Sequence, residues 1–170
     1  MAEKAYNVLF LCTGNSARSI LAEALLRHWG PEKFRSFSAG SQPRGKIHPM
    51  ALKVLNNHRH ETAGLYSKRW DEFVGPGAPK MDFVFTVCDN AAGETCPVWP
   101  GQPMTAHWGI EDPDRTYQNQ EEEYRGFLKA YYELDARIKL FTNLPLSGLD
   151  KLTLQKQLDE IGAISETEET

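Results

Sequence analysis

Cysteine, long apolar runs and clusters of basic residues are all scarce in this sequence. The three cysteines are an odd number, so we do not expect a framework of static disulfides. No apolar run approaches the roughly 20 residues that a membrane helix needs, and we expect no signal peptide, because the first residues lead directly into an apolar stretch. A net charge of −4 without a basic run argues against general nucleic-acid binding. We therefore expect a cytoplasmic protein with reduced thiols that does not bind membranes.

The chain length and composition indicate one domain. A chain of 170 residues can bury a substantial core but is too short for two comfortable domains. We find no internal repeat and no low-complexity tract. We expect a single catalytic domain over residues 1–162, followed by a disordered acidic tail over residues 163–170, and a monomeric protein.

Apolar runs alternate with helix-like stretches along the chain. The alternation predicts a parallel sheet of four strands with helices on both of its faces. The predicted strands are 7–11, 34–40, 81–87 and 104–109, and the predicted helices are 20–29, 48–55, 70–73, 120–141 and 149–161.

Residues 12–19, with the sequence CTGNSARS, connect the first strand to the first helix. Unpaired N–H groups and the positive end of the helix dipole favour an anion at such a position. Small residues let the loop curl around a tetrahedral oxyanion, and the Arg18 guanidinium adds a planar set of donors. The predicted oxyanion-binding residues are Thr13, Gly14, Asn15, Ser16, Ala17 and Arg18.

Cys12 is the candidate nucleophile of this loop. The field that attracts an anion also favours a thiolate, so we expect the pKa of Cys12 to lie below its ordinary value. The hydroxyl of Ser19 could donate a hydrogen bond to that sulfur. The alternative is that Cys12 is a small buried hydrophobe, as lone cysteines often are.

Cys88 follows the third predicted strand, and Cys96 lies eight positions further on. In a continuous helix, eight rises would separate the two Cα atoms by about 12 Å, whereas a disulfide tolerates at most about 7 Å. Pairing them requires a loop or an unwinding helix, which Gly93 and Pro97 would permit. Two interpretations of Cys88 and Cys96 therefore remain open: they form a disulfide with a change in conformation, or they are two unrelated thiols.

Asp112 follows the fourth predicted strand and precedes Pro113. The carboxyl ends of parallel strands share one edge of the sheet, so Cys12, Cys88 and Asp112 should lie close together there. Asp112 could then protonate a leaving oxygen, although Asp-Pro is also a common structural turn. No metal site is predicted, because none of these histidines has metal-ligand spacing with the cysteines: His48, His58, His60 and His107.

Together these motifs resemble a known family. Cys12-x5-Arg18-Ser19 after a strand, with Asp112-Pro113 far downstream, resembles the low-molecular-weight protein tyrosine phosphatases. Cys88 and Cys96, with the segments 98–101 and 107–109, resemble the arsenate reductases built on that fold. The resemblance runs from Val8 to Ile161 and implies a low-molecular-weight tyrosine phosphatase-like fold (phosphotyrosine protein phosphatase I-like).

The resemblance implies arsenic detoxification by a relay of cysteines. Cys12 would attack arsenate, which phosphate or sulfate could mimic, while Asp112 protonates the departing oxygen. Cys88 would then attack Cys12, release arsenite and form a Cys12–Cys88 disulfide. Cys96 would resolve it, leaving a disulfide for thioredoxin, or glutathione with glutaredoxin, to reduce. No bound cofactor is implied.

Two departures from the phosphatase pattern disfavour phosphotyrosine as substrate. Ala17 stands where those enzymes usually carry a second cysteine, and Asp114-Arg115, with a single Tyr117, replaces their tyrosine pair. A low-molecular-weight phosphatase acting on phosphomonoesters is the alternative function, and a non-enzymatic oxyanion-binding regulator is a third possibility.

Overall fold

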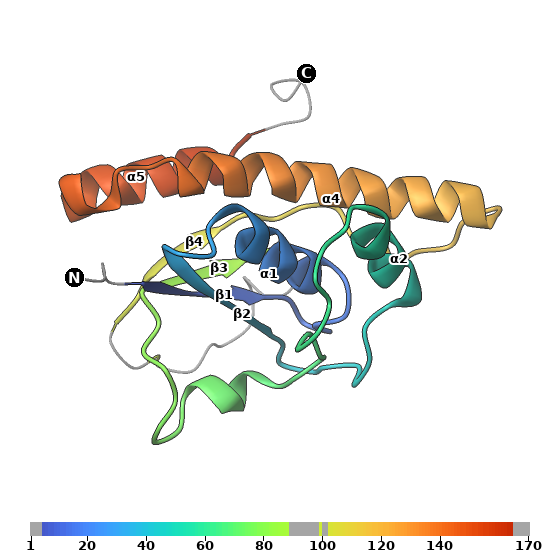
Figure 1. Cartoon of the computed structure of the whole chain (residues 1–170), viewed down its shortest axis with the longest axis horizontal. Coiled ribbons are helices and arrows are strands. Elements are labelled where there is room, and N and C mark those ends of the chain that lie inside the picture. Colours follow the sequence, from blue (N-terminus) through green and yellow to red (C-terminus); the bar gives the residue numbers. More distant parts are fainter. Residues whose placement is uncertain (1–4, 89–98, 100–101, 165–170) are drawn as a thin grey trace.

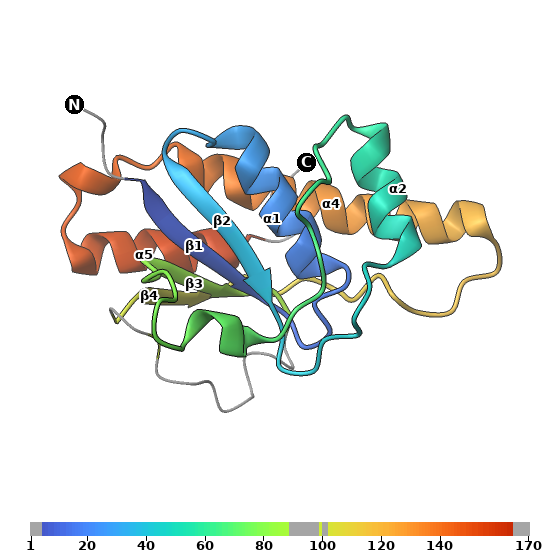
Figure 2. The ribbon, with the colours of Figure 1, turned by 60° about the horizontal axis from the view of Figure 1, so that its bottom comes forward.

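The computed structural model describes residues 5–88, 99 and 102–164, and they form a four-stranded sheet with its helices. The strands are β1 (Tyr6–Leu11), β2 (Phe34–Ala39), β3 (Phe83–Thr86) and β4 (Met104–His107). They pair in the order β2-β1-β3-β4, and all three pairings are parallel (Figure 2). The predicted four-stranded parallel sheet is confirmed.

The helices begin close to their predicted positions. The α-helices are α1 (Arg18–Trp29), α2 (Pro49–Asn57), α4 (Gln120–Thr142) and α5 (Lys151–Gly162), and the 3-10 helices are η1 (Trp70–Phe73) and η2 (Leu146–Gly148). Side-chain caps fix three of the starts: His48 accepts from Met50 N before α2, Asn119 from Glu122 N before α4, and Asp150 from Thr153 N before α5. The helix η2 was not predicted.

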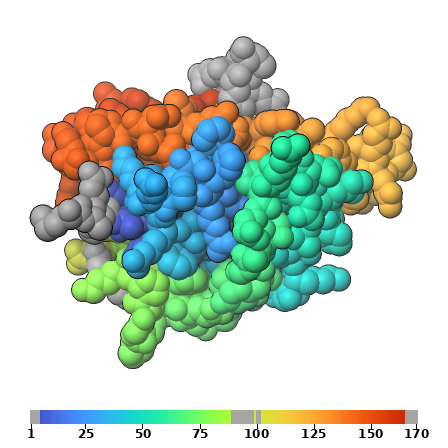
Figure 3. Space-filling view, in the orientation of Figure 1, coloured from blue at the N-terminus to red at the C-terminus, as the bar shows by residue number. Residues whose placement is uncertain are grey.

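Alternation along β1 divides the core into two layers. Val8 and Phe10 pack in the larger apolar cluster with the α-helices, whereas Leu9 and Leu11 pack in a smaller cluster with Trp70 and Phe73. Within the described residues, the α-helices therefore lie on one side of the sheet and η1 on the other (Figure 1). The space-filling view shows α4 and α5 as a continuous band along one edge (Figure 3).

Three strands are shorter than predicted: β2 by one residue, β3 by three and β4 by two. The strand β3 begins one residue after Asp82, whose carboxylate accepts the Asn7 backbone N–H at 2.8 Å. The strand β4 ends at His107, and the next side chain, Trp108, is fully buried and donates its indole N–H to Leu158 O at 3.0 Å. Within the described residues, no helix combines the length and the apolar character needed to cross a membrane.

The strand order places the candidate site. The chain leaves β1 for β2 on one side and later returns to β3 on the other side of β1, so the order reverses between β1 and β3. Ligands of open parallel sheets bind outside the carboxyl ends of the strands at such a reversal. Leu11 pairs with Thr86 across it, which brings the residues after β1 and β3 to the same edge.

Candidate active site

Residues 12–17 form a tight loop between β1 and α1, and the loop surrounds a small pocket. Five of the six predicted oxyanion-binding residues line this pocket together with Cys12: Gly14, Asn15, Ser16, Ala17 and Arg18. Within the described part of the chain, no side chain caps the N-terminus of α1. The first N–H groups of that helix are therefore available to a bound anion.

The other two predicted loop residues lie outside the pocket lining. The hydroxyl of Thr13 lies 3.9 Å from Cys88 Sγ. Ser19 is fully buried and accepts a hydrogen bond from Asn15 Nδ2 at 2.8 Å. Since Ser19 uses a lone pair in that contact, its own proton remains for another acceptor, and a donation to Cys12 stays a prediction.

Asn15 gives the loop its shape. Its φ of 42° lies in the left-handed region, which asparagine tolerates better than most residues. The buried side chain also donates to Ser38 Oγ at 3.0 Å and accepts the Lys68 backbone N–H at 2.8 Å. These bonds tie the loop to β2 and to the segment before η1, so the pocket is held open before any ligand arrives.

A buried charge pair lies behind Asn15 and was missed by the sequence reasoning. Glu23 on α1 accepts from Ser38 Oγ at 2.5 Å and from Arg27 at 2.7 Å, and Lys68 Nζ lies 3.8 Å from it. Burial raises the pKa of Glu23 and lowers the pKa of Lys68. Lys68 lies in a polar stretch of sequence, which predicts an exposed side chain, and only the fold shows that it is buried.

Cys12 and Cys88 meet at the edge of the sheet, as predicted. Both are buried, with 6% and 2% of their surfaces exposed, and the two thiols lie within hydrogen-bonding reach of each other. A hydrogen bond between them is the largest cause that raises the pKa of Cys12, followed by burial, while Arg18 acts in the opposite direction. The expectation of a lowered pKa was therefore wrong for this arrangement, because a neighbouring thiol stabilises the protonated sulfur.

Asp112 lies over the loop through contacts with Arg18. The guanidinium donates to Ile110 O at 3.0 Å and pairs with the Asp112 carboxylate at 3.3 Å. Asp112 lines the pocket with Cys12 and leaves 48% of its side chain exposed. The predicted convergence of Cys12, Cys88 and Asp112 is thus present, and Arg18 contacts the Asp112 segment as well as lining the pocket.

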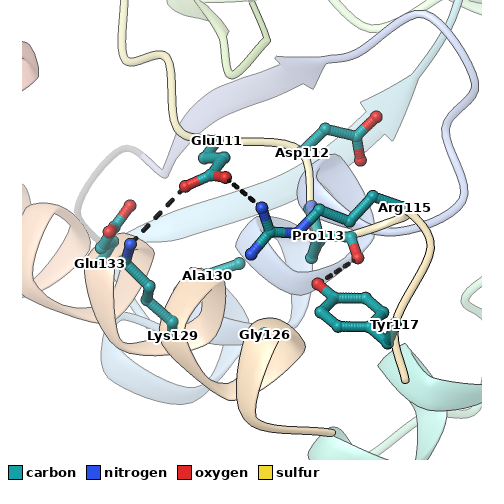
Figure 4. A pocket seen from close by; sticks show the side chains of 9 residues that line it. All are labelled: Glu111, Asp112, Pro113, Arg115, Tyr117, Gly126, Lys129, Ala130 and Glu133. Atoms are coloured by element: carbon teal, nitrogen blue, oxygen red, sulfur yellow. Dashed lines mark hydrogen bonds and ion pairs between the residues drawn. The ribbon is translucent and has the colours of Figure 1, made fainter. Parts of the chain in front are cut away.

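A second pocket adjoins Asp112, and Tyr117 fixes its wall (Figure 4). The Tyr117 hydroxyl donates to Pro113 O at 2.7 Å. A Cβ on Gly126 of α4 would lie 2.0 Å from that hydroxyl, so only glycine leaves room for the ring at this position. Tyr117 therefore anchors the Asp112 loop against α4 instead of facing the oxyanion pocket.

Arg44 and Asp114 line the oxyanion pocket and form an ion pair with each other. Neither was predicted as a site residue. Arg44 stands between the turn residues Pro43 and Gly45, which give no signal for binding. The fold alone brings this cation next to Gly14.

Cys96 lies outside the described residues. Among those that are described, no group of three His, Cys, Asp or Glu side chains is arranged to hold a metal ion. The predicted site residues with a described position are thus placed, and Cys96 stays a prediction.

Comparisons with known proteins agree with this geometry. A family model for low molecular weight phosphotyrosine protein phosphatase matches residues 7–155. The chain belongs to this family. The resemblance inferred from Cys12, Arg18 and Asp112 is therefore confirmed.

Similar family members include proteins named arsenate reductase. One from Shouchella clausii (strain KSM-K16) is 34% identical over 135 residues, which cover 79% of this chain and 93% of that protein. The structure of a thioredoxin-dependent arsenate reductase from Corynebacterium glutamicum has a TM-score of 0.62 and 27% identity, covering 86% of this chain and 65% of that one. Vibrio vulnificus Wzb, solved with benzylphosphonate, has a TM-score of 0.63 and 20% identity, covers 82% of this chain and 98% of that one, and shares the fold.

Proposed function

We propose that this protein reduces arsenate to arsenite, with Cys12 as the nucleophile and the 12–18 loop as the oxyanion site. The observation that carries the proposal is that Cys88 lies within hydrogen-bonding reach of Cys12 beside the oxyanion pocket. Hydrolysis of a phosphoester needs one sulfur. Reduction of As(V) needs two electrons, and two thiols in contact supply them when they form a disulfide.

In the first step, Cys12 gives its proton to an oxygen of the bound arsenate, and the resulting thiolate attacks arsenic to form a sulfur–arsenic bond. One arsenic–oxygen bond breaks, and Asp112 supplies the proton with which that oxygen leaves as water. Arg18 and the N–H groups at the start of α1 hold the remaining negative oxygens. When Arg18 contacts the oxyanion, its ion pair with Asp112 loosens, which leaves the Asp112 carboxyl free to turn toward the departing oxygen.

In the second step, the Cys88 thiolate attacks the Cys12 sulfur and a disulfide forms. The electron pair of the sulfur–arsenic bond moves to arsenic, which leaves as arsenite. Two thiolate sulfurs are oxidised and one As(V) is reduced to As(III), so the electrons balance. Cys88 begins in contact with Cys12, so this step needs little movement of the chain.

We further propose that Cys96 attacks the Cys12–Cys88 disulfide and returns Cys12 to its thiol form. The Cys88–Cys96 disulfide would then be reduced by an external dithiol, thioredoxin or glutathione with glutaredoxin. The thioredoxin-dependent relative from C. glutamicum supports thioredoxin as the first candidate. The relay needs a reducing compartment, and we propose the cytoplasm. The enzyme would act as a monomer without a bound cofactor.

The test is arsenite production by the wild-type protein and by its three Cys→Ser variants, each assayed with thioredoxin and with glutathione plus glutaredoxin. We expect Cys12→Ser and Cys88→Ser to lose turnover with both reductants. Loss in Cys96→Ser with thioredoxin alone would identify Cys96 as the resolving thiol. A wild-type protein that binds phosphate yet makes no arsenite with either reductant would refute the proposal.

Family membership keeps a phosphatase as the second candidate. A phosphate monoester carries the same tetrahedral anion, and Cys12, Arg18 and Asp112 could hydrolyse it without a second thiol. Aryl phosphate turnover that exceeds arsenate reduction and survives Cys88→Ser would favour this candidate.

A further inference from the structure

Two carboxylates of the loop after β4 are each paired with an arginine at the oxyanion pocket. Asp112 pairs with Arg18 at 3.3 Å, and Asp114 pairs with Arg44. The Asp114 backbone N–H also donates to Asp112 Oδ1 at 2.9 Å, which fixes the spacing of the two carboxylates. The first pair belongs to the reaction proposed above, whereas the second has no part in it.

Arg44 lies along the rim of the pocket. Its backbone N–H donates to Gly14 O at 3.0 Å, and a Cβ on Gly14 would lie 3.2 Å from Arg44 Nε. The Arg44 side chain is 54% exposed, whereas Cys12, which lines the same pocket, is 6% exposed. The sulfur therefore lies deep in the pocket and the guanidinium at its mouth.

Asp114 is held in place from its other side by His48. The Nδ1 atom of His48 accepts the Met50 backbone N–H at 3.0 Å, so in the neutral ring the proton is on Nε2. That Nε2 atom lies 3.5 Å from Asp114 Oδ1, and the ring packs on Phe127 with centroids 4.5 Å apart. The Arg44–Asp114 bridge thus joins the two loops on either side of the pocket mouth.

The geometry of in-line displacement determines which part of a substrate lies next to the Arg44–Asp114 ion pair. The attacking and leaving atoms lie roughly opposite one another on the central atom. An attack by Cys12 from the depth of the pocket therefore points the leaving group toward the mouth. For arsenate the leaving group is one oxygen, but for a monoester it is an oxygen that carries an organic group.

We propose that the Arg44–Asp114 bridge determines specificity, admitting inorganic tetrahedral oxyanions and disfavouring aryl monoesters. The inference rests on the proposed function, because it explains how a phosphatase fold selects arsenate. An inorganic oxyanion fits beneath the closed bridge, whereas an aryl group must displace it. Ion pairs as exposed as this one are weak, so opening the bridge should change relative affinity by about fivefold.

The experiment measures equilibrium binding by calorimetry, so it does not depend on turnover. Inorganic phosphate and benzylphosphonate are titrated into wild type, Arg44→Ala and Asp114→Asn. We expect the affinity of benzylphosphonate relative to phosphate to rise about fivefold in both variants. A purely electrostatic effect would give a different result. Arg44→Ala would weaken the binding of both phosphate and benzylphosphonate, Asp114→Asn would strengthen the binding of both, and the ratio of the two affinities would stay unchanged.

Matched controls come from Arg125 and Glu121, an exposed ion pair on α4 at 2.5 Å. Arg125→Ala and Glu121→Gln make the same changes in net charge, and we expect them to leave the ratio at its wild-type value. An unchanged ratio in Arg44→Ala and Asp114→Asn would overturn the specificity role. A wild-type protein that binds phosphate but makes no arsenite would instead refute the proposed function, while a raised ratio would still establish the bridge as a barrier to aryl groups.

Discussion

The clearest prediction concerns the proton of Cys12. Its hydrogen bond with Cys88 is the largest cause that raises the pKa of Cys12, and Arg18 opposes it. Replacing Cys88 by alanine removes the hydrogen bond and the nearby sulfur, and leaves Arg18 in place. We therefore expect the pKa of Cys12 to fall in Cys88→Ala, so that more thiolate is present at neutral pH.

The size of the effect follows from the interaction that is lost. A hydrogen bond that stabilises the neutral thiol contributes about 0.5–1.5 kcal/mol. At about 1.4 kcal/mol per factor of ten, the thiolate fraction below the pKa should rise about 2- to 12-fold. The alkylation rate of Cys12 should rise by the same factor, because the thiolate is the species that reacts.

The assay is iodoacetamide labelling across a pH series, with Cys12 quantified by peptide mass spectrometry. Fitting the rate against pH separates the midpoint, which reports the pKa, from the plateau, which reports access to a buried sulfur. Cys88→Ser is the matched control, since its hydroxyl keeps a donor and acceptor there without a second thiolate. We expect its midpoint to lie between those of wild type and Cys88→Ala. An unchanged midpoint in Cys88→Ala would refute the reasoning.

Three further predictions test the framework of the site. Gly40→Ala should cost about 1–3 kcal/mol and most of the activity, because a Cβ there would lie 2.4 Å from Thr13 O; urea unfolding and arsenate turnover measure both. Lys68→Met should cost about 1–3 kcal/mol, because buried Glu23 loses one of its two cations and keeps Arg27, measured by urea unfolding at pH 7. Burial lowers the pKa of His60, so as the pH drops below about 6.5 this histidine is protonated in the unfolded chain before it is protonated in the folded one. The free energy of unfolding should therefore decrease over that pH range, and it should decrease less in His60→Gln.

Each of these predictions has an outcome that contradicts it. Gly75→Ala, where a Cβ would meet nothing within 4 Å, should be nearly neutral, and an equal loss there would remove the steric argument for Gly40. For the buried pair, adding Glu23→Gln to Lys68→Met should recover stability, and no recovery would contradict the charge argument. An unaltered slope of stability against pH in His60→Gln would exclude that histidine as its source.

Sequence alone determined the parts of this protein that are local in the chain. The loop from Cys12 to Ser19 could be recognised because a strand, small residues, an arginine and a helix follow one another directly, and α1 begins at Arg18. The four strands were found from their apolar runs, and the rule that parallel strands end at one edge brought Asp112 to the loop. Strand ends were less accurate, because an apolar run does not mark where a strand stops: β3 begins after Asp82 and β4 ends before Trp108, although both backbones still bond to the neighbouring strand.

Only the tertiary structure decided the contacts between distant residues. Arg44 and Asp114 are 70 positions apart and meet because two loops end at the same rim. Lys68 is buried beside Glu23 because the segment before η1 crosses the end of β2, where Gly40 bridges Arg69. The expected low pKa of Cys12 was wrong for the same reason: the helix field is local to residues 12–19, whereas Cys88, 76 positions away, raises it through space. Local spacing specifies backbone geometry, but burial and pairing depend on which segments the fold brings together.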